Sequence, residues 1–259
     1  MKRKAAELKC IARGNLTRHY GVPMGAMVVS ELIQTVPLLF FSMNLTIYSG
    51  VKDWVIYYVA AFVVALIGVI LAMGNSWIAL HMCRREEYHF KDLFHGFVHH
   101  PDKYILATLL MTLIIMVPML PGMAIMIVAA ITDNLIMLIV ASVVLIAGYV
   151  FAIIWMLGYS LTMILLLDNK CIGIIDALKE SKRLMKGNKG RMFYIGLSFI
   201  GWILLGMLSL GIGLLWIMPY MTQTQTVFYL DVIGELDNPV SPQTNPYQQQ
   251  QNAYQNMWN

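Results

Sequence analysis

Glu31 is the residue of this sequence whose type and surroundings most clearly suggest chemistry. It stands near the middle of the apolar segment 21–45, GVPMGAMVVSELIQTVPLLFFSMNL, beside Ser30, Gln34 and Thr35. A carboxyl group at the depth of a bilayer costs a few kcal/mol and by default indicates function. Glu31, with Gln34 beside it, is therefore a candidate proton or cation site of a transporter. The alternative is a protonated or hydrogen-bonded glutamate that fixes helix packing.

A second polar group lies near the carboxyl end of the chain. Residues 222–226 read TQTQT inside the apolar segment 213–233, and they include Gln223 and Gln225. If this segment faces the first one, Asn75 of segment 54–80 could join the same interior. The alternative is simple hydrogen bonding between helices, worth under about 1 kcal/mol per contact.

The remaining chemistry-bearing residues predict neither a metal site nor an enzyme. His95 and His99 share a helical face and could bind zinc, but only Asp102 stands at a fitting distance along the chain. A solvated helix end is the better interpretation. The sequence has no H-E-x-x-H or G-x-S-x-G motif. We expect no catalytic residues, no metal and no cofactor.

The most basic stretch is residues 181–194, SKRLMKGNKGRMFY. It lacks the G-x-x-x-x-G-K-[ST] spacing of a phosphate loop and the interleaved aromatic residues of a nucleic-acid site. We predict a helix that ends at Gly187-Asn188, where a left-handed residue is readily accepted. Nearby cations would then contact anionic lipid headgroups, not nucleic acid. The headgroup candidates are Arg13, Arg18, Lys182, Arg183, Lys186, Lys189 and Arg191.

Composition places all these residues in a membrane protein. The chain has 259 residues, of which 59% are hydrophobic and 12% charged, and its mean hydropathy is +0.67. Soluble domains have about 25% charged residues, and several apolar runs here exceed the roughly 18 residues typical of a transmembrane helix. The predicted class is an all-α, polytopic helical membrane protein.

Six transmembrane helices are predicted in an integral membrane domain of residues 1–237. The sequence VPMLPG at 117–122 predicts a kink or partial break in the third, and GIG at 211–213 separates the last two. One long span over 192–233 is the alternative to that last hairpin. The predicted spans are residues 21–45, 54–80, 104–130, 135–167, 192–210 and 213–233.

The distribution of cations predicts the orientation. All but one of the 18 Lys and Arg residues fall in segments 1–20, 81–103 and 169–191, and the exception is Lys52. By the positive-inside rule these three segments are cytoplasmic. With six spans, both termini are cytoplasmic too.

Each cytoplasmic segment also contains a predicted amphipathic helix, at 2–13, 84–98 and 172–186. Such helices lie along the headgroup layer, although they could instead pack on the protein itself. The junctions that follow read RGNLTR (13–18), VHHPDK (98–103) and KGNKGR (186–191). This similarity suggests three repeated units, each an amphipathic helix followed by two spans.

Residues 238–259, NPVSPQTNPYQQQQNAYQNMWN, form a tail rich in Pro, Gln and Asn without charge or apolar period. The composition predicts disorder. The tail could bind a partner protein or be passive.

The stretch from Asp176 to Tyr229 resembles a bacterial integral membrane family, domain of unknown function 975. The matching features are A-L-K-x-S, M-K-G-N-K, L-S-F-I-G-W, G-I-G-x-L-W, and P-Y followed by F-Y. The resemblance extends over most of residues 1–235, but the third and fourth spans look longer and richer in Met. It implies a multi-pass protein of the bacterial cytoplasmic membrane and implies no particular activity.

Two classes of function remain open from the sequence. One is a transport, export or immunity-type membrane component, which Glu31 and the 222–226 segment favour. The other is a non-catalytic scaffold or regulator that binds anionic lipid and partner proteins, which the tail and the absence of a catalytic motif favour.

Overall fold

The computed structural model describes residues 3–43, 45, 50–169 and 171–237, and within them it is helical without strands. The predicted tail, 238–259, lies outside the described residues. The elements are α1 (Ala5–Leu16), α2 (Gly21–Met43), α3 (Val51–Arg84), η1 (Phe90–Phe94), α4 (His95–Val98), α5 (Pro101–Met116), η2 (Val117–Met119), α6 (Leu120–Thr132), α7 (Leu135–Tyr159), α8 (Thr162–Asp168), α9 (Ile174–Leu184), α10 (Lys189–Leu208) and α11 (Leu214–Ile233).

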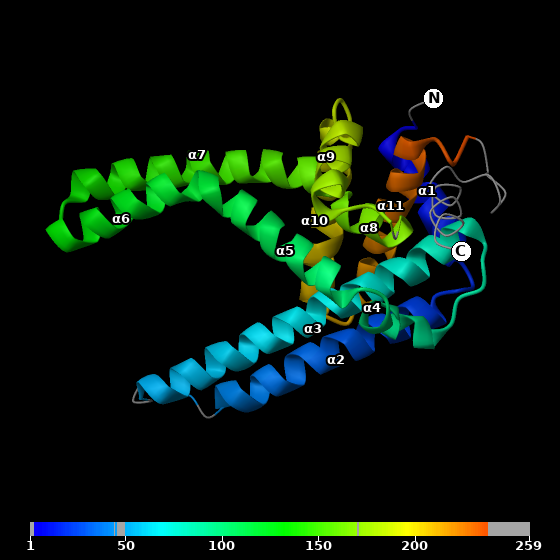
Figure 1. Cartoon of the computed structure of the whole chain (residues 1–259), viewed down its shortest axis with the longest axis horizontal. Coiled ribbons are helices and arrows are strands. Elements are labelled where there is room, and N and C mark those ends of the chain that lie inside the picture. The colour runs from blue at the N-terminus through cyan, green and yellow to red at the C-terminus, as the bar shows by residue number, and fades with distance from the viewer. Residues whose placement is uncertain (1–2, 44, 46–49, 170, 238–259) are drawn as a thin grey trace.

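Two long hairpins, α2–α3 and α6–α7, extend from a region where the shorter helices gather (Figure 1). In that region α11 packs against α1, α2, α3 and α10. The largest buried cluster lies there and includes Leu8, Leu165, Phe228 and Tyr229. Elements from both chain ends therefore build one common core.

In the part of the chain that the structure describes, five helical segments are long and apolar enough to cross a membrane: 21–43, 51–84, 101–132, 135–168 and 189–208. Between 11% and 22% of the residues in their most apolar windows are buried in the protein. The rest of that apolar surface, including Leu39, Val63 and Ile127, faces outward. Burying it in lipid is strongly favourable, which indicates a membrane protein.

Helix α11 is the exception among the six predicted spans. It is a separate helix, so α10 and α11 are two helices and not one, but it is not apolar enough to count with the other five. Half of its residues are buried, among them Gln223, Thr224 and Thr226. A helix that is polar on several sides is stable only inside other protein, and the TQTQT segment is enclosed in this way.

The predicted interruption at 117–122 is confirmed by the 3₁₀ turn η2, which contains Pro118. A second break, between α7 and α8, was not predicted. There the buried Ser181 hydroxyl of α9 accepts from the Leu161 N–H (3.2 Å) and donates to the Gly158 carbonyl (3.1 Å). The amide of Gln225 on α11 donates to the Ser160 carbonyl (3.2 Å). Side chains of two other helices thus satisfy backbone groups that the break frees.

The single helix predicted over 84–98 is wrong. Helix α3 ends at Arg84, Arg85 is left-handed (φ 58°), and the segment then forms η1 and the one-turn α4. Leu93 is fully buried against α3 at Gly74, where a Cβ would lie 1.8 Å from the Leu93 carbonyl oxygen. This segment therefore packs on the protein, and only glycine at position 74 permits the contact.

The prediction of a helix end at Gly187-Asn188 is three residues late, because α9 ends at Leu184, but Gly187 is left-handed (φ 79°) in the turn before α10. The matching Gly14-Asn15 pair does not end a helix, since α1 continues to Leu16 and the left-handed residue is Arg18 (φ 70°). The middle junction has its left-handed residue at His100 (φ 52°). All three junctions contain a left-handed residue just before the next long helix, at different alignment positions.

We predict that Ser181→Ala destabilises the α7–α8 break, because Leu161 N–H and Gly158 C=O would remain buried without this partner. The expected cost is about 1–3 kcal/mol, measured by thermal unfolding of the protein in lipid nanodiscs. Ser142→Ala is the matched control, because its hydroxyl donates to the Leu138 carbonyl of its own helix. Equal stability of the two variants would contradict the assigned role of Ser181.

Candidate functional site

A cavity of about 610 Å³ lies between the α2–α3 hairpin and the first half of α11. Its walls combine polar side chains with methionine and leucine. The lining residues are Met27, Ser30, Glu31, Gln34, Gly68, Ala72, Asn75, Ser76, Gly211, Leu214, Leu215, Met218, Thr222 and Gln225.

Helix α2 presents Glu31 and Gln34 to this cavity because residues three and four apart share a helical face. The buried Ser30 hydroxyl accepts from the Asn75 amide of α3 (3.0 Å), and the Gln34 amide donates to the Ser30 carbonyl (3.1 Å). Gln34 also lies over Gly68, where a Cβ would come 2.3 Å from its Oε1. These contacts hold the polar side chains of α2 and α3 in place beside the exposed Glu31.

Helix α11 contributes Thr222 and Gln225 to the cavity, and the Gln225 amide also reaches the α7–α8 break. Gln223 points elsewhere, because its amide donates to the Cys83 sulfur (3.0 Å). The structure therefore brings together four of the five intramembrane polar candidates, Glu31, Gln34, Asn75 and Gln225, and leaves Gln223 outside the cavity.

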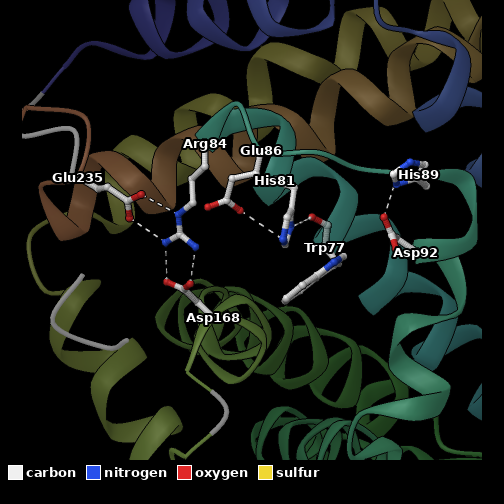
Figure 2. A network of polar contacts seen from close by, with 8 residues as sticks. All are labelled: Trp77, His81, Arg84, Glu86, His89, Asp92, Asp168 and Glu235. Carbon is white, nitrogen blue, oxygen red and sulfur yellow. Dashed lines mark hydrogen bonds and ion pairs between the residues drawn. The ribbon is translucent and has the colours of Figure 1, made fainter. Parts of the chain in front are cut away.

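A second polar centre joins the ends of several helices (Figure 2). The Arg84 guanidinium donates to both oxygens of Asp168 (2.6 and 3.0 Å) and to both oxygens of Glu235 (2.7 and 2.8 Å). The Tyr229 hydroxyl also donates to Asp168 (2.8 Å). The three charged side chains are only 12%, 3% and 13% exposed. We call Arg84, Asp168 and Glu235 the ion triad.

Asp231 forms a neighbouring centre near the carboxyl end of α11. Its side chain is 1% exposed and accepts from Arg3 (3.0 Å) and from Arg191 (2.5 Å). The hydrogen bond to Asp231 raises the pKa of the Arg3 guanidinium. Arg191 also donates to the Arg3 carbonyl (2.6 Å), so the first described residues are held against α10 and α11.

A family model described as "Protein of unknown function (DUF975)" matches residues 1–235. The chain belongs to this family. The match covers the cavity, the ion triad and the Asp231 centre, and its last residue is Glu235, the third member of the ion triad. No curated protein and no solved structure matches the DUF975 chain.

Sequence reasoning missed the ion triad of this DUF975 protein. Its members come from the ends of α3 and α8 and from the turn after α11, so they are far apart in sequence. The available signal was a charged residue at the end of α3 and of α8, and another two residues after α11. The sequence does not show that these three charges face one another, because only the fold brings them together.

The seven headgroup candidates divide into two groups. Arg13, Arg18, Lys182, Arg183 and Lys186 are exposed, with Arg183 also paired to Glu180. Two others contact the protein: Lys189 donates to the Ile154 carbonyl at the surface (3.2 Å), and Arg191 is bound to the buried Asp231. Arg191 was predicted to contact lipid headgroups, but its guanidinium is bound to the buried Asp231. A buried carboxylate attracts a guanidinium more strongly than the membrane surface does.

The histidines form contacts among themselves and with Trp77. The His95 ring stacks on Trp77 (3.9 Å between centroids) and on His99 (4.0 Å). His81 Nδ1 lies 3.0 Å from the Trp77 carbonyl and its Nε2 lies 3.3 Å from Glu86 (Figure 2). These ring contacts join α3 to α4, and none of the four residues lines the cavity.

We predict that Asp168→Asn destabilises the protein by about 1–3 kcal/mol, because one acceptor oxygen becomes an NH2 donor and leaves a buried hydrogen of Arg84 or Tyr229 without an acceptor. Asp176→Asn is the matched control, since Asp176 forms an exposed pair with Lys179 at 3.6 Å and such pairs contribute about 0–1 kcal/mol. Thermal unfolding in nanodiscs measures both. A loss at Asp168 no larger than that at Asp176 would argue against the triad.

Proposed function

We propose that this protein is a transport or export component, including the immunity type, of the bacterial cytoplasmic membrane. Its cargo would bind in the cavity between α2, α3 and α11. The observation that carries the proposal is the position of Glu31, which faces this cavity from the middle of an apolar helix.

The composition of the cavity supports a binding role. Ligand sites of about 300–1,000 Å³ usually combine apolar walls with a few polar groups, and this cavity has that size and lining. Polar side chains at membrane depth are costly unless they have partners or a function. Ser30, Gln34, Asn75 and Gln225 have protein partners, which positions them around Glu31.

We further propose that the protein has six transmembrane helices, with α11 enclosed by the others, and that both termini lie in the cytoplasm. The ion triad and the Asp231 centre contain three arginines, Arg3, Arg84 and Arg191. Each belongs to one of the three segments assigned to the cytoplasm by the positive-inside rule. We also propose three repeated units. The ion triad supports this, because each of its residues stands where the last long helical segment of a unit ends: Arg84 ends α3, Asp168 ends α8, and Glu235 follows α11.

We predict that Ala72→Phe abolishes or strongly reduces transport, since the exposed Ala72 side chain lines the cavity and a phenyl ring would occupy it. Val63→Phe is the matched control, because Val63 is exposed on roughly the opposite side of the same helix. The measurement is the resistance of expressing cells to membrane-active compounds, at equal protein levels. Full activity of Ala72→Phe would contradict the proposal.

The second candidate function is a non-catalytic scaffold or regulator on anionic lipid, with the tail as a site for a partner protein. It is favoured by the exposed Lys179 and Lys182, which lie three residues apart on α9, and by the exposed Lys186 in the turn that follows. Each such lysine near a surface contributes about 1 kcal/mol toward anionic lipid.

For this candidate we predict that replacing Lys179, Lys182 and Lys186 with glutamine lowers binding of phosphatidylglycerol to the full chain at least tenfold. Native mass spectrometry of lipid-bound protein measures the effect. The control is Lys52→Gln, which removes an exposed cation at the start of α3. It should leave phosphatidylglycerol binding unchanged. Unchanged lipid binding by the triple variant would rule out α9 as the lipid-binding surface.

A further inference from the structure

The charge of the cavity between α2, α3 and α11 has one sign. Among the described residues that line it, Glu31 is the charged one, and no Lys, Arg or His lies in its wall. The other polar groups are hydroxyls and amides. A cavity with an uncompensated carboxylate attracts a positively charged ligand, and low-dielectric walls strengthen the attraction.

The donor set does not suit a divalent metal ion. Calcium prefers six to eight oxygen ligands with several carboxylates, whereas this cavity offers one carboxylate. Within the described residues, no three His, Cys, Asp or Glu side chains lie close enough to hold a metal. The single negative charge matches a ligand with a single positive charge.

The apolar part of the wall indicates what surrounds that charge on the ligand. Met27, Leu214, Leu215 and Met218 lie opposite or beside the polar groups. Methionine side chains are flexible and polarisable and accommodate varied apolar shapes. At about 610 Å³ the cavity is too large for a bare monovalent ion and fits a drug-sized molecule.

We infer that this cavity binds lipophilic monovalent organic cations, with Glu31 as the counter-ion. The inference rests on the proposed function and names its substrate class. The amide oxygens of Gln34 and Asn75 supply further acceptors, since both amide nitrogens already donate to Ser30. The apolar body of the cation would lie against Met27 and Met218.

The test uses two ions of the same shape and opposite charge, tetraphenylphosphonium and tetraphenylborate. The full chain is placed in phosphatidylcholine nanodiscs, and empty nanodiscs correct for partitioning into lipid. We expect saturable binding of tetraphenylphosphonium and none of tetraphenylborate. Glu31→Gln should weaken phosphonium binding at least tenfold, whereas Glu31→Asp, which keeps the charge, should weaken it only a few-fold.

Glu7→Gln is the control for net charge, because Glu7 is exposed on α1, and it should leave the affinity unchanged. Equal binding of both ions, absence of saturable phosphonium binding, or an unchanged affinity of Glu31→Gln would overturn the inference. If Ala72→Phe still blocks transport in that case, the ligand class is wrong and the cavity remains the transport site. If Ala72→Phe is also without effect, the proposed function fails as well.

Discussion

The bridge from Arg84 to Asp168 and Glu235 is the interaction on which the rest of the structure depends. A buried guanidinium is tolerated only where carboxylates satisfy it with good geometry, and here two carboxylates do so with four hydrogen bonds. Because Arg84 ends α3, Asp168 ends α8 and Glu235 lies in the turn after α11, their pairing fixes where these three helices meet. The long apolar hairpins can then diverge from that point (Figure 1).

The polar side chains of α11 also need partners within the protein. Its polar side chains would be costly against lipid, and the structure uses them on other elements instead: Gln225 on the α7–α8 break, Gln223 on Cys83, and Asp231 on Arg3 and Arg191. The face of α11 that turns toward α2 presents Thr222 and Gln225 to the cavity. That face and Glu31 form the cavity to which we assign function.

The sequence predicted the helical segments well because apolar runs and Gly or Pro positions act locally. It also placed the break at Pro118 and the left-handed turn at Gly187 between α9 and α10. It did not predict the break after Tyr159, since that break depends on Ser181 and Gln225 from distant helices. The cavity was foreseen in part, from Glu31 and the TQTQT segment. The pairing of Arg191 with Asp231 was not, because a cation near a helix start looks the same in sequence whether it faces lipid or a buried carboxylate.

Hydrogen–deuterium exchange of the α11 amides in nanodiscs tests the central claim most directly, by comparing the wild-type protein with Arg84→Met. If the ion triad holds the helices together, the variant should exchange faster throughout α8 and α11, while the outer part of the α6–α7 hairpin keeps its wild-type rates. Unchanged protection of α11 in the variant, or a uniform rise along the whole chain, would contradict this account.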